Sequence, residues 1–178
     1  EGNADGGDGA QFSKPHGLTV DTKGNVFVAD TGNHTIRKIT KEGEVTLFAG
    51  TPGVGGSRDG EAMESQFFRP EGVAVDERGN VIVADSGNHT IRKITLEGEV
   101  RTLVGQAGVE GFTVGTARDS RLRHPSGVIV DKQGNIFVTE RWGHTVRRVA
   151  AGGMVSMKAG KWGVSGLSLI HISEPTRP

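Results

Sequence analysis

The sequence predicts an all-β protein, a β-propeller built of four-stranded antiparallel blades, of which about three are present. Three observations support this expectation. A repeat of constant length runs through the chain. Each copy contains four short runs rich in Val, Ile, Thr and Phe, separated by turns that carry Gly, Asn and Asp. The long connectors between copies keep the spacing of the repeat, as an ordered crossover does and a linker does not.

The repeat is 55 residues long, because Pro15, Pro70 and Pro125 are separated by 55 positions each. The same spacing recurs at glycines, aspartates and histidines along the whole unit. Matching sets are Gly17/Gly72/Gly127, Asp21/Asp76/Asp131, His34/His89/His144 and Gly50/Gly105/Gly160. Such agreement indicates one structural unit per repeat, with the units stacked side by side.

The four runs of each unit are expected to form a meander of adjacent antiparallel strands. In the first copy they span residues 17–20, 26–29, 35–39 and 45–49. The later copies place them at 72–75, 81–84, 90–94 and 100–104, and at 127–130, 136–139, 145–149 and 155–159. The first run carries Gly and small apolar residues, which predicts the inner strand, where blades crowd toward the axis.

The first two runs are apolar on both faces and are expected to be buried between neighbouring blades. The third run carries Arg and Lys, and we expect it to lie nearer the solvent. The connectors, residues 51–69 and 106–124, end near Phe67 and Leu122, which we expect to anchor between blades. The predicted propeller fragment covers residues 1–166, with blades at about 12–50, 67–105 and 122–160.

Composition narrows the classes of function. Lys plus Arg and Asp plus Glu each total 21 in 178 residues, so the basic excess typical of nucleic-acid-binding proteins is missing. Cysteine is absent, which excludes disulfides, thiol nucleophiles and cysteine-ligated zinc. No apolar run is long enough for a membrane helix, so we expect no membrane insertion. The chain starts without Met or a signal-like segment, so we expect it to be cut from a longer protein, with extracellular, periplasmic and cytoplasmic locations all open.

Polar residues that recur in the copies are expected to build turns rather than a catalytic centre, because a residue present in every copy serves the repeat. Aspartates at strand ends accept hydrogen bonds from free backbone N–H groups. The repeated histidines lie one per blade, too far apart for one zinc ion to bind all three. We therefore expect no metal site among the structural turn residues, which are Asp21, Asp76, Asp131, Asp30, Asp85, Asn33, Asn88, His34, His89 and His144.

Two segments carry a family resemblance. Residues 12–39 read F-S-K-P-H-G-L-T-V-D-T-K-G-N-V-F-V-A-D-T-G-N-H-T-I-R-K-I, and residues 67–94 repeat this pattern closely. The pattern resembles the NHL repeat, in a variety with long spacing. The third copy departs from it, with Glu140 in place of Asp and Gly143 in place of Asn. The resemblance implies a ring of six blades, so the chain would be an incomplete ring whose remaining blades belong to the parent protein.

The end of the chain is expected to lie outside the propeller. Residues 167–177 break the 55-residue spacing and resemble the translation of a sequencing-library adaptor. We therefore interpret residues 167–178 as a non-native or disordered tail and exclude them from the fold.

Function is expected where the copies differ. The position after the repeated proline holds His16, Glu71 and Ser126, and it opens the inner strand at the mouth of the central channel. Glu71-Gly72 is similar to the Glu before an inner-strand Gly that binds metal in six-bladed enzymes of the lactonase and paraoxonase type. One carboxylate and one imidazole are too few for a divalent site, so the missing blades would have to supply further ligands.

A second candidate surface is a basic rim made by the third strands and the loop before the last of them. Some NHL propellers in ring-finger proteins bind RNA on a basic face, and a basic rim could neutralise phosphates. Here aromatic stacking partners are scarce and acidic residues offset the charge, so nucleic acid is disfavoured as a partner. The candidate rim residues are Arg141, Trp142, Arg147 and Arg148.

The sequence thus favours a non-catalytic scaffold that binds a protein or an extended ligand through its loops and channel mouth, with no catalytic residue and no cofactor assigned. The alternative is a fragment of a six-bladed, metal-assisted hydrolase or lyase, and a divalent metal is expected only in that case. A second alternative is an RNA-binding NHL face.

Overall fold

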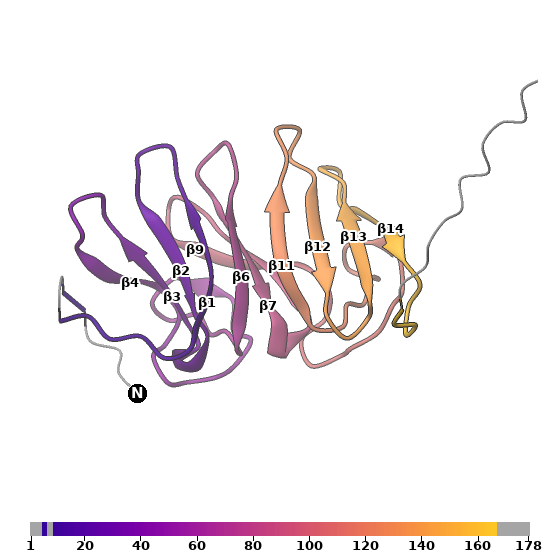
Figure 1. Ribbon diagram of the computed structural model, residues 1–178, viewed down its shortest axis with the longest axis horizontal. Helices are drawn as coiled ribbons and strands as arrows, with labels where there is room; N and C mark the ends of the chain where they lie inside the picture. Colours follow the sequence, from indigo (N-terminus) through magenta and orange to yellow (C-terminus); the bar gives the residue numbers. More distant parts are fainter. Residues whose placement is uncertain (1–4, 7–8, 167–178) are drawn as a thin grey trace, which may run out of the picture.

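The computed structural model describes residues 5–6 and 9–166 and contains three antiparallel sheets stacked in sequence order (Figure 1). The first sheet has the order β1-β2-β3-β4. Its strands are β1 Pro15–Val20, β2 Val26–Asp30, β3 Thr35–Ile39 and β4 Val45–Ala49. These strands are rich in Val, Ile, Thr and Phe, and Gly24 turns the chain at a positive φ of 84° between β1 and β2.

The second and third sheets repeat this meander and confirm the predicted fold class. The second contains β6 Pro70–Val75, β7 Val81–Asp85, β8 Thr90–Ile94 and β9 Glu99–Val104. The third contains β11 Pro125–Val130, β12 Ile136–Glu140, β13 Thr145–Val149 and β14 Met154–Gly160. Short 3-10 turns, η1 Thr31–Asn33 and η2 Ser86–Asn88, follow β2 and β7.

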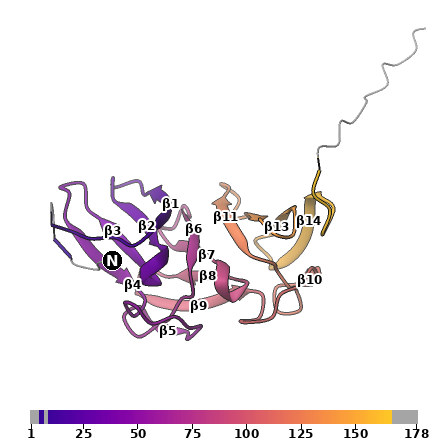
Figure 2. The same ribbon diagram turned by 60° about the horizontal axis from the view of Figure 1, so that its bottom comes forward.

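Each connector adds a short fifth strand that the sequence did not reveal. β5 Gly60–Glu61 pairs with β9, and β10 Gly115–Thr116 pairs with β14, so each lies on the outer edge of the following sheet (Figure 2). The connector therefore leaves one blade at its outer strand, pairs with the outer strand of the next and enters that blade at its inner strand. Phe67 and Leu122, near the connector ends, are fully buried, as expected.

The inner strands approach one another closely. A Cβ placed on Gly72 would lie 2.1 Å from the carbonyl oxygen of Ser126, and one on Gly17 would lie 2.4 Å from that of Glu71. Real Cβ atoms do not come this close to a backbone oxygen. Glycine at these two positions is therefore what lets β1, β6 and β11 lie side by side.

The apolar core forms two layers, one on each side of the middle sheet. Phe27, Ala29 and Ile36 of the first sheet pack against Val81 and Val83 of the second. The opposite face of the second sheet packs against the third, through Ile82, Ala84, Ile91, Val128 and Val138. The expected burial of both faces holds for β7, in which every residue is buried.

The two end sheets correct that expectation. Leu18 is 69% exposed and Ile129 is 64% exposed, although their counterparts in the middle sheet, Val73 and Ala74, are buried. Each exposed side chain lies on the face that has no neighbouring sheet among residues 5–6 and 9–166. An apolar strand is buried on both faces only where sheets flank it on both sides.

The expectation that the third strand lies nearer the solvent was wrong for one arginine in each copy. Arg37, Arg92 and Arg147 are at most 1% exposed. Each guanidinium forms an ion pair with an acidic residue at the end of the preceding strand, namely Asp30, Asp85 or Glu140. The long side chain brings its charge to a buried partner, which alternation of polar and apolar residues along the strand does not reveal.

No helix in the described part of the chain is long and apolar enough to cross a membrane. The predicted tail, residues 167–178, lies outside the described residues.

Candidate functional site

The three sheets bring His16, Glu71 and Arg141 together where the inner strands begin. His16 lies on β1 and Glu71 on β6, and the Nδ1 atom of His16 is 3.3 Å from the carbonyl oxygen of Glu71. Arg141 follows β12 in the third sheet. Its Nη2 atom lies 3.4 Å from Nε2 of His16 and 3.8 Å from Oε2 of Glu71. One guanidinium from the third sheet therefore contacts side chains of the other two.

Ser126 does not join this contact. Its Oγ lies 3.1 Å from Oγ1 of Thr139, in its own sheet. Of the three residues expected at the channel mouth, two are in contact, and the third hydrogen-bonds within its own blade. Arg141, which the sequence placed on a rim, takes part in the mouth instead.

An aromatic side chain lies beside this contact. Trp142 is 52% exposed, and its ring lies 3.8 Å from that of His124, centroid to centroid. A cleft of about 90 Å³ is formed here by Arg69, Glu71, Ser86, Gly87, His124, Arg141 and Trp142. We name this set, together with His16, the mouth cleft. It combines two guanidinium groups, one carboxylate and one exposed aromatic ring, so it offers charge and stacking to a ligand.

The remaining rim residues lie elsewhere. Arg147 is fully buried, so it is withdrawn as a surface contact. Arg148 donates from Nη2 to Oδ1 of Asn135 at 2.8 Å. Asn135 directly precedes β12, so this contact is at the opposite end of the strand from the mouth cleft. The expected basic rim is not one continuous surface.

The turn aspartates accept several hydrogen bonds each. Oδ1 of Asp131 accepts from the backbone N–H groups of Gln133 and Asn135 at 3.0 and 2.8 Å, and Oδ2 accepts from the Asn135 amide at 2.7 Å. The hydrogen bond from the Asn135 side chain lowers the pKa of Asp131 below its usual value. Asp21 and Asp76 accept the same set of bonds in their own turns. These carboxylates hold turns in place.

The second group of acidic residues is buried and joins three segments. Asp85 accepts from the backbone N–H of Phe68 at 2.8 Å, from the Asn88 amide at 2.7 Å and from Nη1 of Arg92 at 2.9 Å. Burial raises the pKa of Asp85 to about 6, in spite of the nearby Arg92 charge. Asp30 accepts the equivalent bonds from Ser13, Asn33 and Arg37.

The third sheet keeps only part of this arrangement. Glu140 accepts from the N–H of Arg123 at 2.7 Å and from Nε of Arg147 at 2.6 Å. In the other sheets an aspartate from the preceding segment also binds the guanidinium, since Asp5 and Asp59 lie 2.5 and 2.6 Å from Nη2 of their arginines. Val114 stands at the position of Asp59. Within the described residues, Nη1 and Nη2 of Arg147 have no hydrogen-bond partner.

The repeated histidines end the short turns in the left-handed region. His34, His89 and His144 have φ values of 62°, 59° and 57°. Nδ1 of His34 accepts the backbone N–H of Arg69 at 3.1 Å, and Nδ1 of His89 accepts that of His124 at 3.2 Å. Burial lowers the pKa of His34 and of His89. Each of these two rings thereby joins its own sheet to the chain entering the next sheet.

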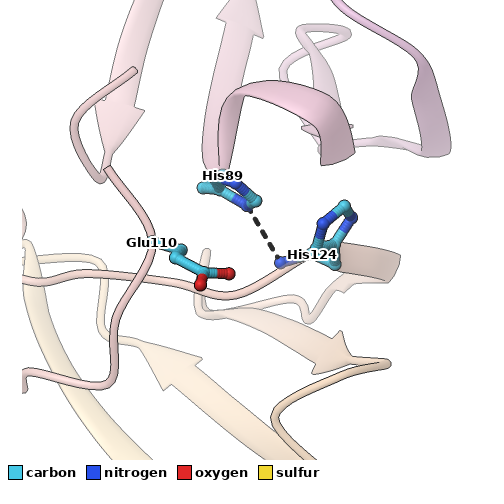
Figure 3. A group of neighbouring side chains, drawn as sticks. All are labelled: His89, Glu110 and His124. Carbon is cyan, nitrogen blue, oxygen red and sulfur yellow. Dashed lines mark hydrogen bonds between the residues drawn. The ribbon is translucent and has the colours of Figure 1, made fainter. Parts of the chain in front are cut away.

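The sequence reasoning missed one cluster. His89, Glu110 and His124 each offer a nitrogen or carboxylate oxygen, and these atoms all lie within 4.8 Å of one another (Figure 3). Only His89 belongs to the repeated set. Glu110 stands where the preceding repeat has Gly55, and His124 stands where it has Arg69. A comparison of positions 55 residues apart would have found both changes.

Comparisons with known proteins agree with this architecture. Residues 12–39 and 67–94 match the family model of the NHL repeat. The chain is 43% identical over 99 residues to NHL repeat-containing protein 2 of Gallus gallus, in an alignment that covers 54% of this chain and 13% of that protein. It is 33% identical over 113 residues to peptidyl-alpha-hydroxyglycine alpha-amidating lyase 1 of Drosophila melanogaster, covering 60% of this chain and 19% of the lyase.

The solved structures include a protein of unknown function from Bacteroides thetaiotaomicron that superposes with a TM-score of 0.72 and 28% sequence identity. The superposition covers 81% of this chain and 35% of the other. This chain therefore spans only a minor part of the length of each of these three proteins.

Proposed function

Because this chain is an NHL-repeat β-propeller protein, we propose that it is a non-catalytic binding module whose contact surface is the mouth cleft. The partner is a protein segment or another extended ligand. Residues of all three sheets line or flank this cleft, so a ligand placed there contacts three repeats at once. The cleft has a volume of only about 90 Å³, which suits one or two side chains of a longer ligand better than a whole enclosed substrate.

The position of the Arg141 guanidinium carries this proposal. It lies 3.4 Å from the His16 ring nitrogen and 3.8 Å from the Glu71 carboxylate, the two side chains that a metal at this mouth would need as ligands. A divalent ion between them would have to displace a positive charge. The same guanidinium, beside the exposed ring of Trp142, is suited to a ligand carboxylate or backbone carbonyl next to an apolar side chain.

The proposal is tested with an array of immobilised twelve-residue peptides probed with the labelled 178-residue protein. Peptides that bind are then measured in solution against Arg141→Ala, Trp142→Ala and Arg148→Ala. We expect each of the first two substitutions to weaken binding at least about tenfold, the size of a modest hot spot. Arg148→Ala removes the same charge at the opposite end of the strands and should leave affinity unchanged. The proposal would be contradicted if all variants bound the peptides with equal affinity. It would also be contradicted if no peptide lost affinity for Trp142→Ala.

The alternative is a fragment of a metal-assisted lyase or hydrolase. The similarity to an amidating lyase, at 33% identity over 113 residues, favours this candidate. Its metal would need His16 and Glu71 together with ligands from further blades. The test is the melting temperature of the parent protein with millimolar Zn²⁺ or Ca²⁺. A rise that Glu71→Gln abolishes would support the enzyme, whereas no rise would count against it.

The RNA-binding alternative loses support from the buried arginines. Three of the six basic residues on the third strands, Arg37, Arg92 and Arg147, are paired in the interior and cannot neutralise phosphates. A gel-retardation assay at low salt tests whether the remaining basic residues of the third strands bind RNA. The absence of any retarded species would end this alternative.

A further inference from the structure

His89, Glu110 and His124 converge at the junction between the second and third sheets. His89 follows the turn η2 in the second sheet, whereas Glu110 and His124 lie on the connector that leads into the third. Figure 3 shows the Glu110 carboxylate and the His124 imidazole on either side of the hydrogen bond between His124 and His89. One donor atom from each residue lies within 4.8 Å of the other two. The three donors thus come from two elements that the fold holds together.

The preceding junction serves as an internal comparison. There His34 accepts the backbone N–H of Arg69 at 3.1 Å, just as His89 accepts that of His124 at 3.2 Å. The residues in place of Glu110 and His124 are Gly55 and Arg69, neither of which offers a metal ligand. The junction therefore forms without an acidic residue and a second histidine. Glu110 and His124 are therefore additional to what the repeat needs for folding.

We propose that His89, Glu110 and His124 form a binding site for a divalent transition-metal ion of the zinc class. Two imidazole nitrogens and one carboxylate oxygen are a donor set that zinc binds, with a fourth position left for water. Calcium and magnesium prefer sites made of oxygen atoms, so this set selects against them. Zinc ligands stand about 3.5 Å apart around a tetrahedral ion, so the three side chains must move closer to bind it.

The hydrogen bonds at the site indicate which atoms of His89 and Glu110 would bind the ion. Nδ1 of His89 carries no proton, because it accepts the N–H of His124. A cation bound at Nδ1 displaces this N–H group from the lone pair, so a metal–nitrogen bond replaces the hydrogen bond and the His124 amide keeps its proton. Arg123 donates from Nε to Oε2 of Glu110 at 3.1 Å, which leaves Oε1 to reach the ion. Burial also lowers the pKa of both imidazoles, so their neutral, metal-binding forms are favoured near neutral pH.

The site is tested by titrating Zn²⁺ and Co²⁺ into the tag-free, chelator-treated 178-residue protein. Zinc affinity is measured by competition with a chromophoric indicator, and the visible absorption of Co²⁺ reports ligand number and geometry. We expect one equivalent to bind, with a shift of the His124 backbone amide resonance. His124→Arg and Glu110→Gly install the residues of the preceding junction, and each should weaken binding at least about tenfold. His34→Asn alters the equivalent histidine of that junction and is the matched control.

Several results would overturn the proposal. These are the absence of zinc binding by the original chain at submillimolar metal, equal binding by His124→Arg and Glu110→Gly, or loss of binding in His34→Asn. Loss in Glu71→Gln with retention in His124→Arg would place the metal at Glu71 and His16 instead. Circular dichroism melting confirms that each variant folds. If His124→Arg does not fold, Glu110→Gly, which changes a side chain on the exposed connector, decides the question.

Discussion

Arg92 and Asp85 form an ion pair in the middle sheet, with 2.9 Å between Nη1 and Oδ2, and neither side chain is exposed. The pair is embedded in a larger arrangement. The guanidinium also binds the carbonyl oxygens of Gln66 and Arg58 and lies 5.1 Å from the centre of the Phe67 ring. A residue of the third strand thus fixes both the second strand and the connector that arrives from the previous blade.

Asp85→Asn is expected to destabilise the fold strongly. The substitution places an amide NH₂ where the carboxylate accepts hydrogen bonds from Phe68, Asn88 and Arg92, so buried N–H donors lose their acceptor. The loss should be about 1–3 kcal/mol in the free energy of unfolding, measured with urea. Glu99→Gln is the control, since it breaks the solvent-exposed pair with Arg101 and should change stability by less than about 1 kcal/mol. Similar losses in both variants would contradict the structural role of the buried pair.

Val114→Asp is expected to stabilise the third blade. Within the described residues, Nη1 and Nη2 of Arg147 have no partner, whereas Asp59 supplies one to Arg92 at 2.6 Å. A carboxylate at position 114 would restore this bond and should raise the free energy of unfolding by about 1 kcal/mol. Val114→Asn adds a polar group without the charge and should gain less. An unchanged or lower melting temperature for Val114→Asp would show that the guanidinium does not reach this position.

The sequence was sufficient to predict the three sheets, because the repeat supplies three independent copies of each strand and turn. β5 and β10 were missed because a strand of two residues has no pattern of its own. The burial of Arg92 was missed because its partners, Asp59 and Asp85, come from separate elements that only the fold joins. Arg141 was assigned to a rim for a similar reason, since its long side chain reaches across to Glu71 and His16.

Gly72→Ala is expected to disturb the contact between inner strands. The added Cβ would meet the Ser126 carbonyl oxygen at 2.1 Å, and a backbone atom cannot move aside as a side chain can. The expected loss is about 1–3 kcal/mol in the free energy of unfolding. Gly127→Ala is the matched control, because its Cβ would meet only the Thr139 side chain, at 2.9 Å, and Thr139 can rotate. Hydrogen exchange should show the Gly72→Ala effect in β6 and β11, and an equal effect of both substitutions would argue against close packing at Gly72.

Two aspartates are expected to titrate on opposite sides of the ordinary value of 3.8. Burial raises the pKa of Asp85 to about 6, and the hydrogen bond from Asn135 lowers that of Asp131. A raised pKa in the folded state means that the contribution of Asp85 to stability is complete below 3.8 and is lost as pH rises through about 6. The contribution of Asp131 has the opposite sign: it is present above 3.8 and is lost as pH falls through the lowered folded value.

Carbon-13 spectra of the side-chain carboxyl groups, recorded between pH 7 and the onset of acid unfolding, separate the two aspartates. The Asp85 signal should move with a midpoint near pH 6, well before the Asp131 signal changes. Asp131→Asn provides a check on the sign, because its stability should fall below that of the original protein at neutral pH and approach it as pH decreases. An Asp85 midpoint below 3.8 would mean that the charge of Arg92 outweighs burial at this site, and the ion pair would then add stability as the pH rises.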